Sequence, residues 1–168
     1  MLVIENDNFG KHNPHWKFTL GPESYETKDT PKRVEVIKEM LRSDDPFFQQ
    51  FGQAYLTAVY PGVVKGWHYH RLQTDHFVCV AGMAKVVLYD RRDESPTHGE
   101  VSEFFMGERN NILVTIPPGV LHGMKGIGIE TAVIVNIPTH TYKHDDPDEY
   151  RVDPHDNDIP YDWAARDF

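Results

Sequence analysis

Two histidines separated by one residue are the first sign of chemistry in this sequence. His68 and His70 flank Tyr69, and Asp75 follows five residues later. Because successive side chains of a β-strand point to opposite faces, both imidazoles are expected on one face, about 7 Å apart. Imidazole accepts and releases protons near neutral pH and also binds metal ions. The pair therefore indicates a polar site rather than part of an apolar core.

A third histidine, His122, follows a Pro-Pro-Gly turn. Such a turn would place His122 opposite the first pair if the strands on both sides belong to one barrel. Two kinds of chemistry remain open at this point. The imidazoles could transfer protons, or they could bind Fe, Mn, Ni or Zn, which accept imidazole and carboxylate ligands. The ligands of this second alternative are His68, His70, Asp75 and His122.

Period-two patterning from Gln53 onward predicts the strands that must position these side chains. Val, Ile, Phe and Tyr alternate with other residues, and turn-forming residues separate several of the segments. Many short strands with frequent turns indicate a β-sandwich or barrel. The expected strands are residues 53–60, 63–70, 76–81, 84–90, 101–106, 111–116 and 131–137.

The segments before and after these strands have a different character. Residues 1–29 are predicted to be an irregular arm with room for one strand. Thr30 and Pro31 suit the N-cap and first position of a helix, and apolar residues then recur at helical spacing, so a short amphipathic helix is expected to about Arg42. The stretch 143–158 holds seven acids in sixteen residues and is expected to be a solvated loop.

These observations predict one mainly β domain across all 168 residues. Residues 1–50 would form the arm and helix, and residues 51–142 the barrel. Residues 143–168 would form an acidic C-terminal segment, and Tyr161 and Trp163 suggest that it packs back onto the barrel.

Charge and hydropathy exclude several classes of protein. With 17 Lys and Arg against 26 Asp and Glu, the formal net charge is -9 and no basic stripe is present, which argues against a nucleic-acid partner. No apolar run approaches the roughly 18 residues of a membrane span, so no membrane partner is expected. No secretory signal is visible, and Cys79 has no second cysteine to pair with. We expect a cytoplasmic protein.

The two histidine motifs resemble the paired motifs of the cupin superfamily, with Asp75 where that superfamily has Glu. A closer resemblance, over residues 47–168 or so, is to the dTDP-4-dehydrorhamnose 3,5-epimerases. Three segments carry it: Lys65-Gly-Trp-His-Tyr69, Tyr89-Asp-Arg-Arg-Asp-Glu-Ser-Pro-Thr-His-Gly99 and Ile116-Pro-Pro-Gly-Val-Leu-His-Gly123. The resemblance implies a cupin-type jelly-roll β-barrel, a homodimer, and a reaction that needs no metal. That reaction inverts carbons on either side of a 4-keto group in a nucleotide-linked 6-deoxyhexose.

The resemblance also implies a role for individual residues. His68 stands where the family has the base that removes the proton next to the ketone. Asp167 is the candidate for the carboxylate that orients this base. His122 corresponds to a histidine near the developing enolate, and Lys65 takes the place of a diphosphate-binding arginine. Arg92 is a candidate contact for phosphate or for a second subunit.

The sequence departs from the family at the position of the proton donor. The family's tyrosine aligns with Val135, which cannot donate a proton, so Tyr142 or His140 from the adjoining loop is expected to replace it. His70, a candidate substrate-binding residue, stands where the family has a glutamine, and Asp75 stands where it has a lysine that lines the sugar site.

Three functions from different classes follow. The favoured one is an isomerase without cofactor: a nucleotide-sugar epimerase or ketoisomerase with His68 as base. The first alternative is a metal-dependent cupin enzyme with a divalent ion on the His/His/Asp/His set. The second is a sugar-nucleotide binding module that has lost its chemistry.

Overall fold

The computed structural model describes residues 18–20 and 38–164, and every regular element in these ranges is a β-strand. The strands predicted from the period-two pattern are all present, and their ends differ from the prediction by at most two residues. None of the described residues lies in a helix that could cross a membrane. The strands are β1 (Phe18–Leu20), β2 (Tyr55–Val59), β3 (Val64–Tyr69), β4 (Asp75–Ala81), β5 (Met83–Asp90), β6 (Val101–Gly107), β7 (Ile112–Ile116), β8 (Val120–Ile127), β9 (Ala132–Asn136) and β10 (Tyr150–Arg151).

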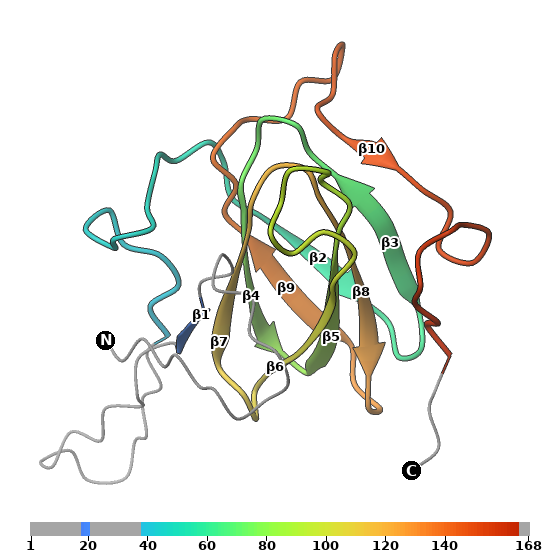
Figure 1. Ribbon diagram of the computed structural model, residues 1–168. Helices are drawn as coiled ribbons and strands as arrows, with labels where there is room; N and C mark the ends of the chain where they lie inside the picture. Colours follow the sequence, from blue (N-terminus) through green and yellow to red (C-terminus); the bar gives the residue numbers. More distant parts are fainter. Residues whose placement is uncertain (1–17, 21–37, 165–168) are drawn as a thin grey trace, which may run out of the picture.

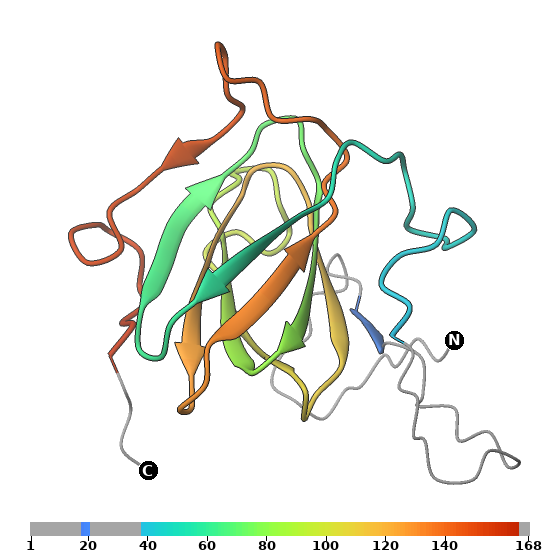
Figure 2. The same ribbon diagram turned by 180° about the vertical axis from the view of Figure 1, so that it is seen from behind.

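The strands form two five-stranded antiparallel sheets that face each other (Figure 1). Sheet A has the order β1-β7-β4-β9-β2, and sheet B has the order β10-β3-β8-β5-β6. Seen from behind, β2 and β9 lie side by side in sheet A, and β3 of sheet B follows next to β2 (Figure 2). Because the chain crosses between the sheets at most connections, strands β2–β9 have the wiring of an eight-stranded jelly roll.

The expected closed barrel is wrong in one respect. Within the described ranges no strand ladder joins sheet A to sheet B, and the two sheets remain a sandwich. An isolated bridge between Pro61 and Gly126 is the contact that ties the end of β2 to β8. The chain passes between sheets through tight corners, so successive strands there face each other instead of pairing.

The main core fills the space between the sheets. On β5, Ala84, Val86 and Leu88 point into this core, while Val87 lies on the outer face of sheet B, as the alternation of a strand requires. Residues from both sheets complete the core, among them Phe77 of β4. The apolar interior fixes the register of the strands, because a shift by one residue would expose these side chains.

A second cluster covers the outer face of sheet B. Trp67 packs there against Trp163 of the C-terminal segment, with ring centroids 4.9 Å apart. Lys125 of β8 donates a hydrogen bond to the backbone carbonyl of Trp163 at 2.7 Å. The C-terminal segment is therefore attached to β3 and β8, the strands that carry His68 and His122.

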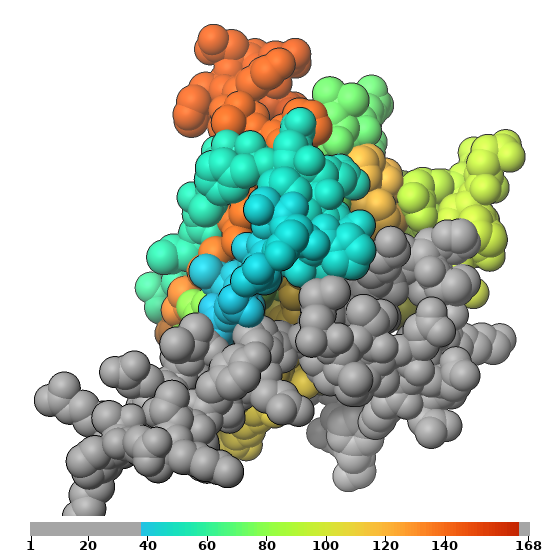
Figure 3. All heavy atoms as spheres, turned by 90° about the vertical axis from the view of Figure 1, so that its left-hand side faces the viewer, coloured from blue at the N-terminus to red at the C-terminus, as the bar shows by residue number. Residues whose placement is uncertain are grey.

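The segment before β2 lies along the outside of sheet A (Figure 3). Met40, Leu41 and Phe47 pack there against Val78 and Leu113. Residues 38–42, with which the expected helix ends, are not helical, and the rest of that helix lies outside the described residues. Met40 and Leu41 pack on the outer face of sheet A instead of forming one face of a helix. The prediction of a helix at residues 38–42 from apolar spacing was therefore wrong.

One long strand, β8, was missing from the predicted set although it carries His122. Its sequence contains Gly123 and Gly126, which weaken a strand pattern. Both glycines are required by close packing: a Cβ on Gly123 would lie 2.8 Å from the Trp163 ring, and one on Gly126 would lie 2.5 Å from the carbonyl oxygen of Tyr60. The glycines therefore mark close approaches and not a loop.

Candidate functional site

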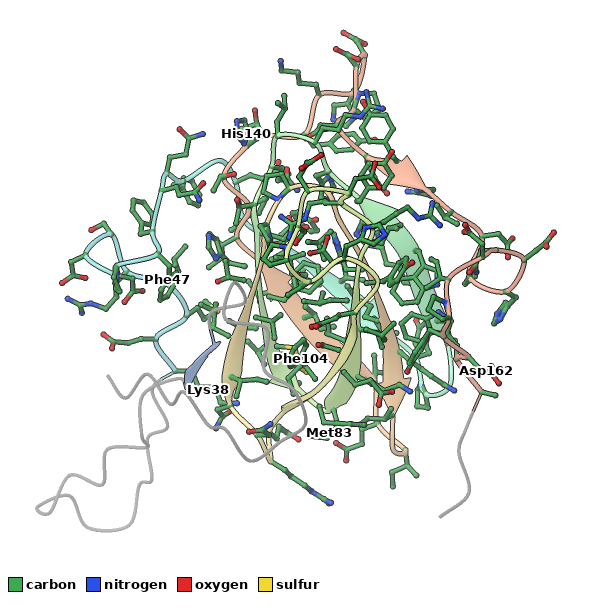
Figure 4. All side chains as sticks on the ribbon, viewed as in Figure 1. Lys38, Phe47, Met83, Phe104, His140 and Asp162 are labelled. Atoms are coloured by element: carbon green, nitrogen blue, oxygen red, sulfur yellow. The ribbon has the colours of Figure 1, made fainter. Side chains whose placement is uncertain are left out.

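The three histidines and Asp75 meet between the two sheets. His68 on β3 is the register partner of His122 on β8, so both side chains point to the same face of sheet B. Asp75 opens β4 on the opposite sheet. One ligand atom of each residue in this group, which also includes His70, lies within 4.8 Å of the others, and all four side chains are buried. Figure 4 shows many nitrogen and oxygen atoms between the sheets in the half of the sandwich toward the His140 label.

The Pro-Pro-Gly turn joins the two histidine motifs directly. The backbone N–H of Gly119 donates a 2.7 Å hydrogen bond to the carbonyl of His70. Gly119 has a φ of 81°, a conformation that residues with a side chain rarely adopt. The turn therefore fixes the start of β8 next to the end of β3, and His122 enters the site from there.

Asp75 is held so that its two oxygens have separate partners. Oδ1 accepts hydrogen bonds from the amide groups of Gln73 at 2.7 Å and Asn136 at 2.8 Å. Oδ2 lies 3.2 Å from Nε2 of His70 and 3.2 Å from Nε2 of His122. Burial opposes ionisation, but the two neighbouring imidazoles hold the pKa of Asp75 well below its usual value. The group is a buried carboxylate at the centre of the site.

The far ring nitrogens of two histidines face backbone carbonyls. Nδ1 of His122 lies 3.1 Å from the carbonyl oxygen of Val120, and Nδ1 of His70 contacts the carbonyl oxygen of Asp148. A carbonyl only accepts, so each Nδ1 carries a proton and each ring is fixed with Nε2 toward Asp75. These contacts turn both imidazoles inward.

Asp148 comes from the acidic segment that the sequence indicated as solvated. Its carboxylate accepts hydrogen bonds from the backbone N–H groups of Arg71 and Leu72 at 2.9 Å and of Gln73 at 3.1 Å. Asp148 thereby holds the connection between β3 and β4, on which His70 and Gln73 stand. No local sequence signal distinguishes this aspartate from its acidic neighbours.

His68 differs from the other two histidines. No residue of the described chain hydrogen-bonds to its ring, which packs at a tilt of 59° against the ring of His122, with centroids 4.1 Å apart. Burial, reinforced by the neighbouring His122, holds the pKa of His68 well below 6.5. His68 is therefore neutral at neutral pH and presents a free lone pair, as a proton acceptor needs.

Asn136 and Tyr55 occupy the region where the resemblance places a tyrosine. Val135 points away from the main core, whereas Asn136 beside it points inward and is buried. The amide of Asn136 donates to the hydroxyl of Tyr55 on β2 at 2.9 Å as well as to Asp75. Burial and the charge of Asp75 raise the pKa of Tyr55 to about 12. Neither residue was predicted from the sequence, because the β2–β9 pairing is what brings them to the site.

Lys65 and Arg92, the two cations singled out in the sequence, lie in different surroundings. The amino group of Lys65 is 3.5 Å from the hydroxyl of Thr57, on the facing strand β2. Burial lowers the pKa of Lys65. Arg92 donates two hydrogen bonds to the carboxylate of Asp90, at 2.8 Å and 2.7 Å. Its guanidinium is thus part of the loop that follows β5.

Tyr142 and His140, the two predicted replacements for the family's tyrosine, do not join the group. Tyr142 is 46% exposed, and its ring packs against His144 with centroids 5.1 Å apart. Nδ1 of His140 lies 3.0 Å from the hydroxyl of Thr139. Asp167 lies outside the described residues.

Comparison with known proteins gives consistent matches. Residues 37–167 match the family model described as dTDP-4-dehydrorhamnose 3,5-epimerase. The chain is 45% identical over 131 residues to the probable low-salt glycan biosynthesis epimerase Agl13 of Haloferax volcanii, covering 77% of this chain and 84% of that protein. It is 42% identical over 125 residues to the spore coat polysaccharide biosynthesis protein SpsL of Bacillus subtilis, covering 74% and 83% respectively.

A solved structure supports the same grouping. The crystal structure of a dTDP sugar isomerase from Desulfovibrio desulfuricans matches with a TM-score of 0.80 and 31% identity. The match covers 92% of this chain and 94% of that one. Sequence and fold therefore point to the same group of sugar-modifying proteins.

Proposed function

Because this chain belongs to the dTDP-4-dehydrorhamnose 3,5-epimerase family, we propose that it is an epimerase or isomerase of a 4-keto-6-deoxyhexose linked to a nucleoside diphosphate. The observation that carries the proposal is His68: a buried, neutral imidazole with a free lone pair, beside a carboxylate that offsets positive charge. Removal of a proton next to a ketone requires such a base.

The proposed reaction begins with His68 accepting the proton from the carbon beside the ketone. The electron pair of the broken C–H bond forms the C=C bond of an enolate, and negative charge moves to the ketone oxygen. Delivery of a proton to the opposite face of that carbon forms the new C–H bond and inverts the centre. The charge of Asp75 favours the imidazolium while His68 holds the proton. Orientation of His68 by Asp167 stays part of the proposal.

For the second proton, the contacts favour Tyr55 over Tyr142. The hydroxyl of Tyr55 is joined to Asp75 through the amide of Asn136. Its raised pKa of about 12 keeps the phenol protonated at neutral pH, as a donor must be. Tyr142 packs against His144 and remains the alternative donor.

Lys65 is the proposed partner of the diphosphate. It lies on β3, three residues before His68, and its amino group faces Thr57 of β2. A single ammonium supplies charge without the fork of an arginine, so it binds phosphate as a point charge. Arg92 is less suited to this task, because its guanidinium is paired with Asp90.

The test of the function is solvent-deuterium exchange into dTDP-4-keto-6-deoxyglucose, followed by NMR. The wild-type protein should incorporate deuterium beside the ketone, and His68→Asn should lower the rate at least 10²-fold, the order of a lost general base. His155→Asn, which changes an exposed histidine, is the matched control and should exchange normally. Absence of exchange with every 4-keto nucleotide sugar tried would favour the binding-module alternative.

A homodimer is also proposed, on the basis of the free edge of sheet A. β2 is the last strand of that sheet among the described residues, and large apolar side chains are exposed on or next to it: Phe51, Leu56 and Tyr60, each 64–65% exposed. An apolar edge of this kind is usually covered. Light scattering should give twice the chain mass, and Leu56→Lys should give monomers. Ile129→Lys, at a 95% exposed turn, should leave the dimer intact.

A cytoplasmic location is proposed with the function. Cys79 is the one cysteine of the chain and is buried with a free thiol. A protein without disulfides suits a reducing compartment.

A further inference from the structure

Three buried atoms of the site converge without hydrogen-bond partners. Nε2 of His70, Nε2 of His122 and Oδ2 of Asp75 are shielded from solvent and unpaired among the described residues. Each nitrogen is 3.2 Å from the carboxylate oxygen, which makes these contacts ion pairs if the imidazoles are charged. Buried polar atoms almost always have a partner, so the arrangement indicates a further group between them.

The opposite atom of each of these side chains is already engaged. Both Nδ1 atoms donate to backbone carbonyls, and Oδ1 of Asp75 accepts from two side-chain amides. With Nδ1 protonated, a neutral imidazole directs the lone pair of Nε2 to the same point as the carboxylate oxygen. Metal-binding histidines are typically oriented in this way, by an outer hydrogen bond from the other ring nitrogen.

We propose that His70, Asp75 and His122 bind one divalent transition-metal ion, with zinc as the first candidate. Ligand atoms about 2.0–2.1 Å from zinc at tetrahedral angles lie about 3.3 Å apart, close to the 3.2 Å separations seen here. Two imidazoles and one carboxylate leave a coordination position open. When bound, the ion would supply a Lewis acid that polarises a carbonyl oxygen.

His68 is not assigned as a ligand, although it lies within reach. Among residues 18–20 and 38–164, no group makes an outer hydrogen bond to its ring of the kind that orients the other two imidazoles. With the other three residues as ligands, His68 remains available as a base next to the ion. The metal site and the proposed epimerase reaction share Asp75, but metal binding is measured without any substrate. The two proposals can therefore be tested separately.

The first experiment is elemental analysis of the untagged protein, purified without chelators or metal columns. We expect about one equivalent of a transition metal per chain. Chelation with phenanthroline should lower Tm by several degrees, and added Zn²⁺ should restore it, since a ligand that binds the folded state stabilises it. Less than about a tenth of an equivalent, together with no Tm response of the chelated protein to Zn²⁺, Mn²⁺, Fe²⁺ or Ni²⁺, would overturn the proposal.

Variants test which residues bind. His70→Ala, His122→Ala and Asp75→Asn should each lose at least 10-fold in Zn²⁺ affinity, whereas His68→Ala should retain one equivalent. Equal loss in His68→Ala would overturn the three-ligand assignment. If the ligand variants do not fold, Co²⁺ substitution of the wild-type protein replaces them: visible absorption bands of a low-symmetry nitrogen and oxygen site are expected, and the spectrum of aqueous Co²⁺ would contradict the site. A metal-free protein that still exchanges deuterium would sink the metal site and leave the proposed function standing.

Discussion

At the scale of single residues, the neutral state of His68 has a consequence for pH dependence. Burial lowers its pKa below 6.5, so the base form persists into mildly acidic solution. We predict that kcat/KM for exchange is constant from about pH 8 to pH 6.5 and falls only at lower pH. Exchange rates measured from pH 4.5 to 8 provide the test. An acid limb centred above pH 6.5 would contradict the assignment of His68 as a desolvated base.

Tyr55 gives a second prediction at this scale. Tyr55→Phe removes the hydroxyl that Asn136 contacts and should lower kcat of epimerisation about 10²-fold or more, as loss of a general acid does. Deuterium exchange, which needs only the base, should fall much less. Tyr142→Phe is the matched control and should stay within about twofold of the wild type in both measurements. The reverse pattern would identify Tyr142 as the donor.

What the sequence could predict at this scale depends on the distance along the chain. His68, His70 and Asp75 lie within eight residues, so strand alternation alone indicates a shared site. Asn136 and Tyr55 are 81 residues apart, and their contact depends on strand pairing that local pattern does not specify. The same holds for His70 and Asp148, which are separated by 78 residues.

At the scale of elements, the loop between β5 and β6 is organised around Asp90. This fully buried carboxylate accepts hydrogen bonds from Arg92 and from the hydroxyls of Ser95 and Thr97. The Asp90-Arg-Arg92 and Ser95-Pro-Thr97 elements, which carried much of the family resemblance, are therefore explained as structural parts of one loop. Gly119 packs against the Arg92 side chain, so the loop also supports the turn that leads to His122.

Asp90→Asn should lower the free energy of unfolding by about 2–4 kcal/mol, because a buried charged network loses its central charge. Burial opposes ionisation, but Arg92 and the two hydroxyls hold the pKa of Asp90 below its usual value. A lowered pKa in the folded state means that the carboxylate stabilises the fold above about pH 4 and that this stabilisation is lost as pH falls further. Urea unfolding at pH 7 and pH 3 should therefore show a smaller effect of the variant at pH 3.

The matched control for that experiment is Asp93→Asn, in the same loop with a 94% exposed side chain. Its unfolding free energy should stay within about 0.5 kcal/mol of the wild type at either pH. Equal losses in both variants would mean that the loop responds to total charge and not to the buried network.

Strands were easier to predict than the other elements for a physical reason. Alternation is imposed by the core between the sheets, so Ala84, Val86 and Leu88 reveal β5 directly. β8 was not predicted because its glycines interrupt the strand pattern. They are required by close contacts with Trp163 and Tyr60, which lie far away in the sequence. The expected helix failed at residues 38–42 because Met40 and Leu41 pack on sheet A.

At the scale of the whole molecule, the site depends on the segment that follows the sandwich. Asp148→Asn should weaken the hold on the β3–β4 connection, because a neutral amide accepts less strongly from three backbone N–H groups. We predict at least a 5-fold loss in kcat/KM and a lower affinity for Zn²⁺, with a change in Tm of no more than about 4 °C. Asp146→Asn, an exposed neighbour, is the control. Unchanged kinetics and metal affinity in Asp148→Asn would show that the connection holds its shape without the tail.

The hydrogen bonds from the backbone of residues 71–73 to Asp148 also link the proposed site to the order in which the chain is synthesised. When strands β2–β9 have left the ribosome, every histidine of the site has been synthesised. Asp148, which contacts His70 and the connection after it, has not. We likewise expect a cut in the acidic segment before Asp148 to loosen the β3–β4 connection from a distance, while strands β2–β9 remain uncut.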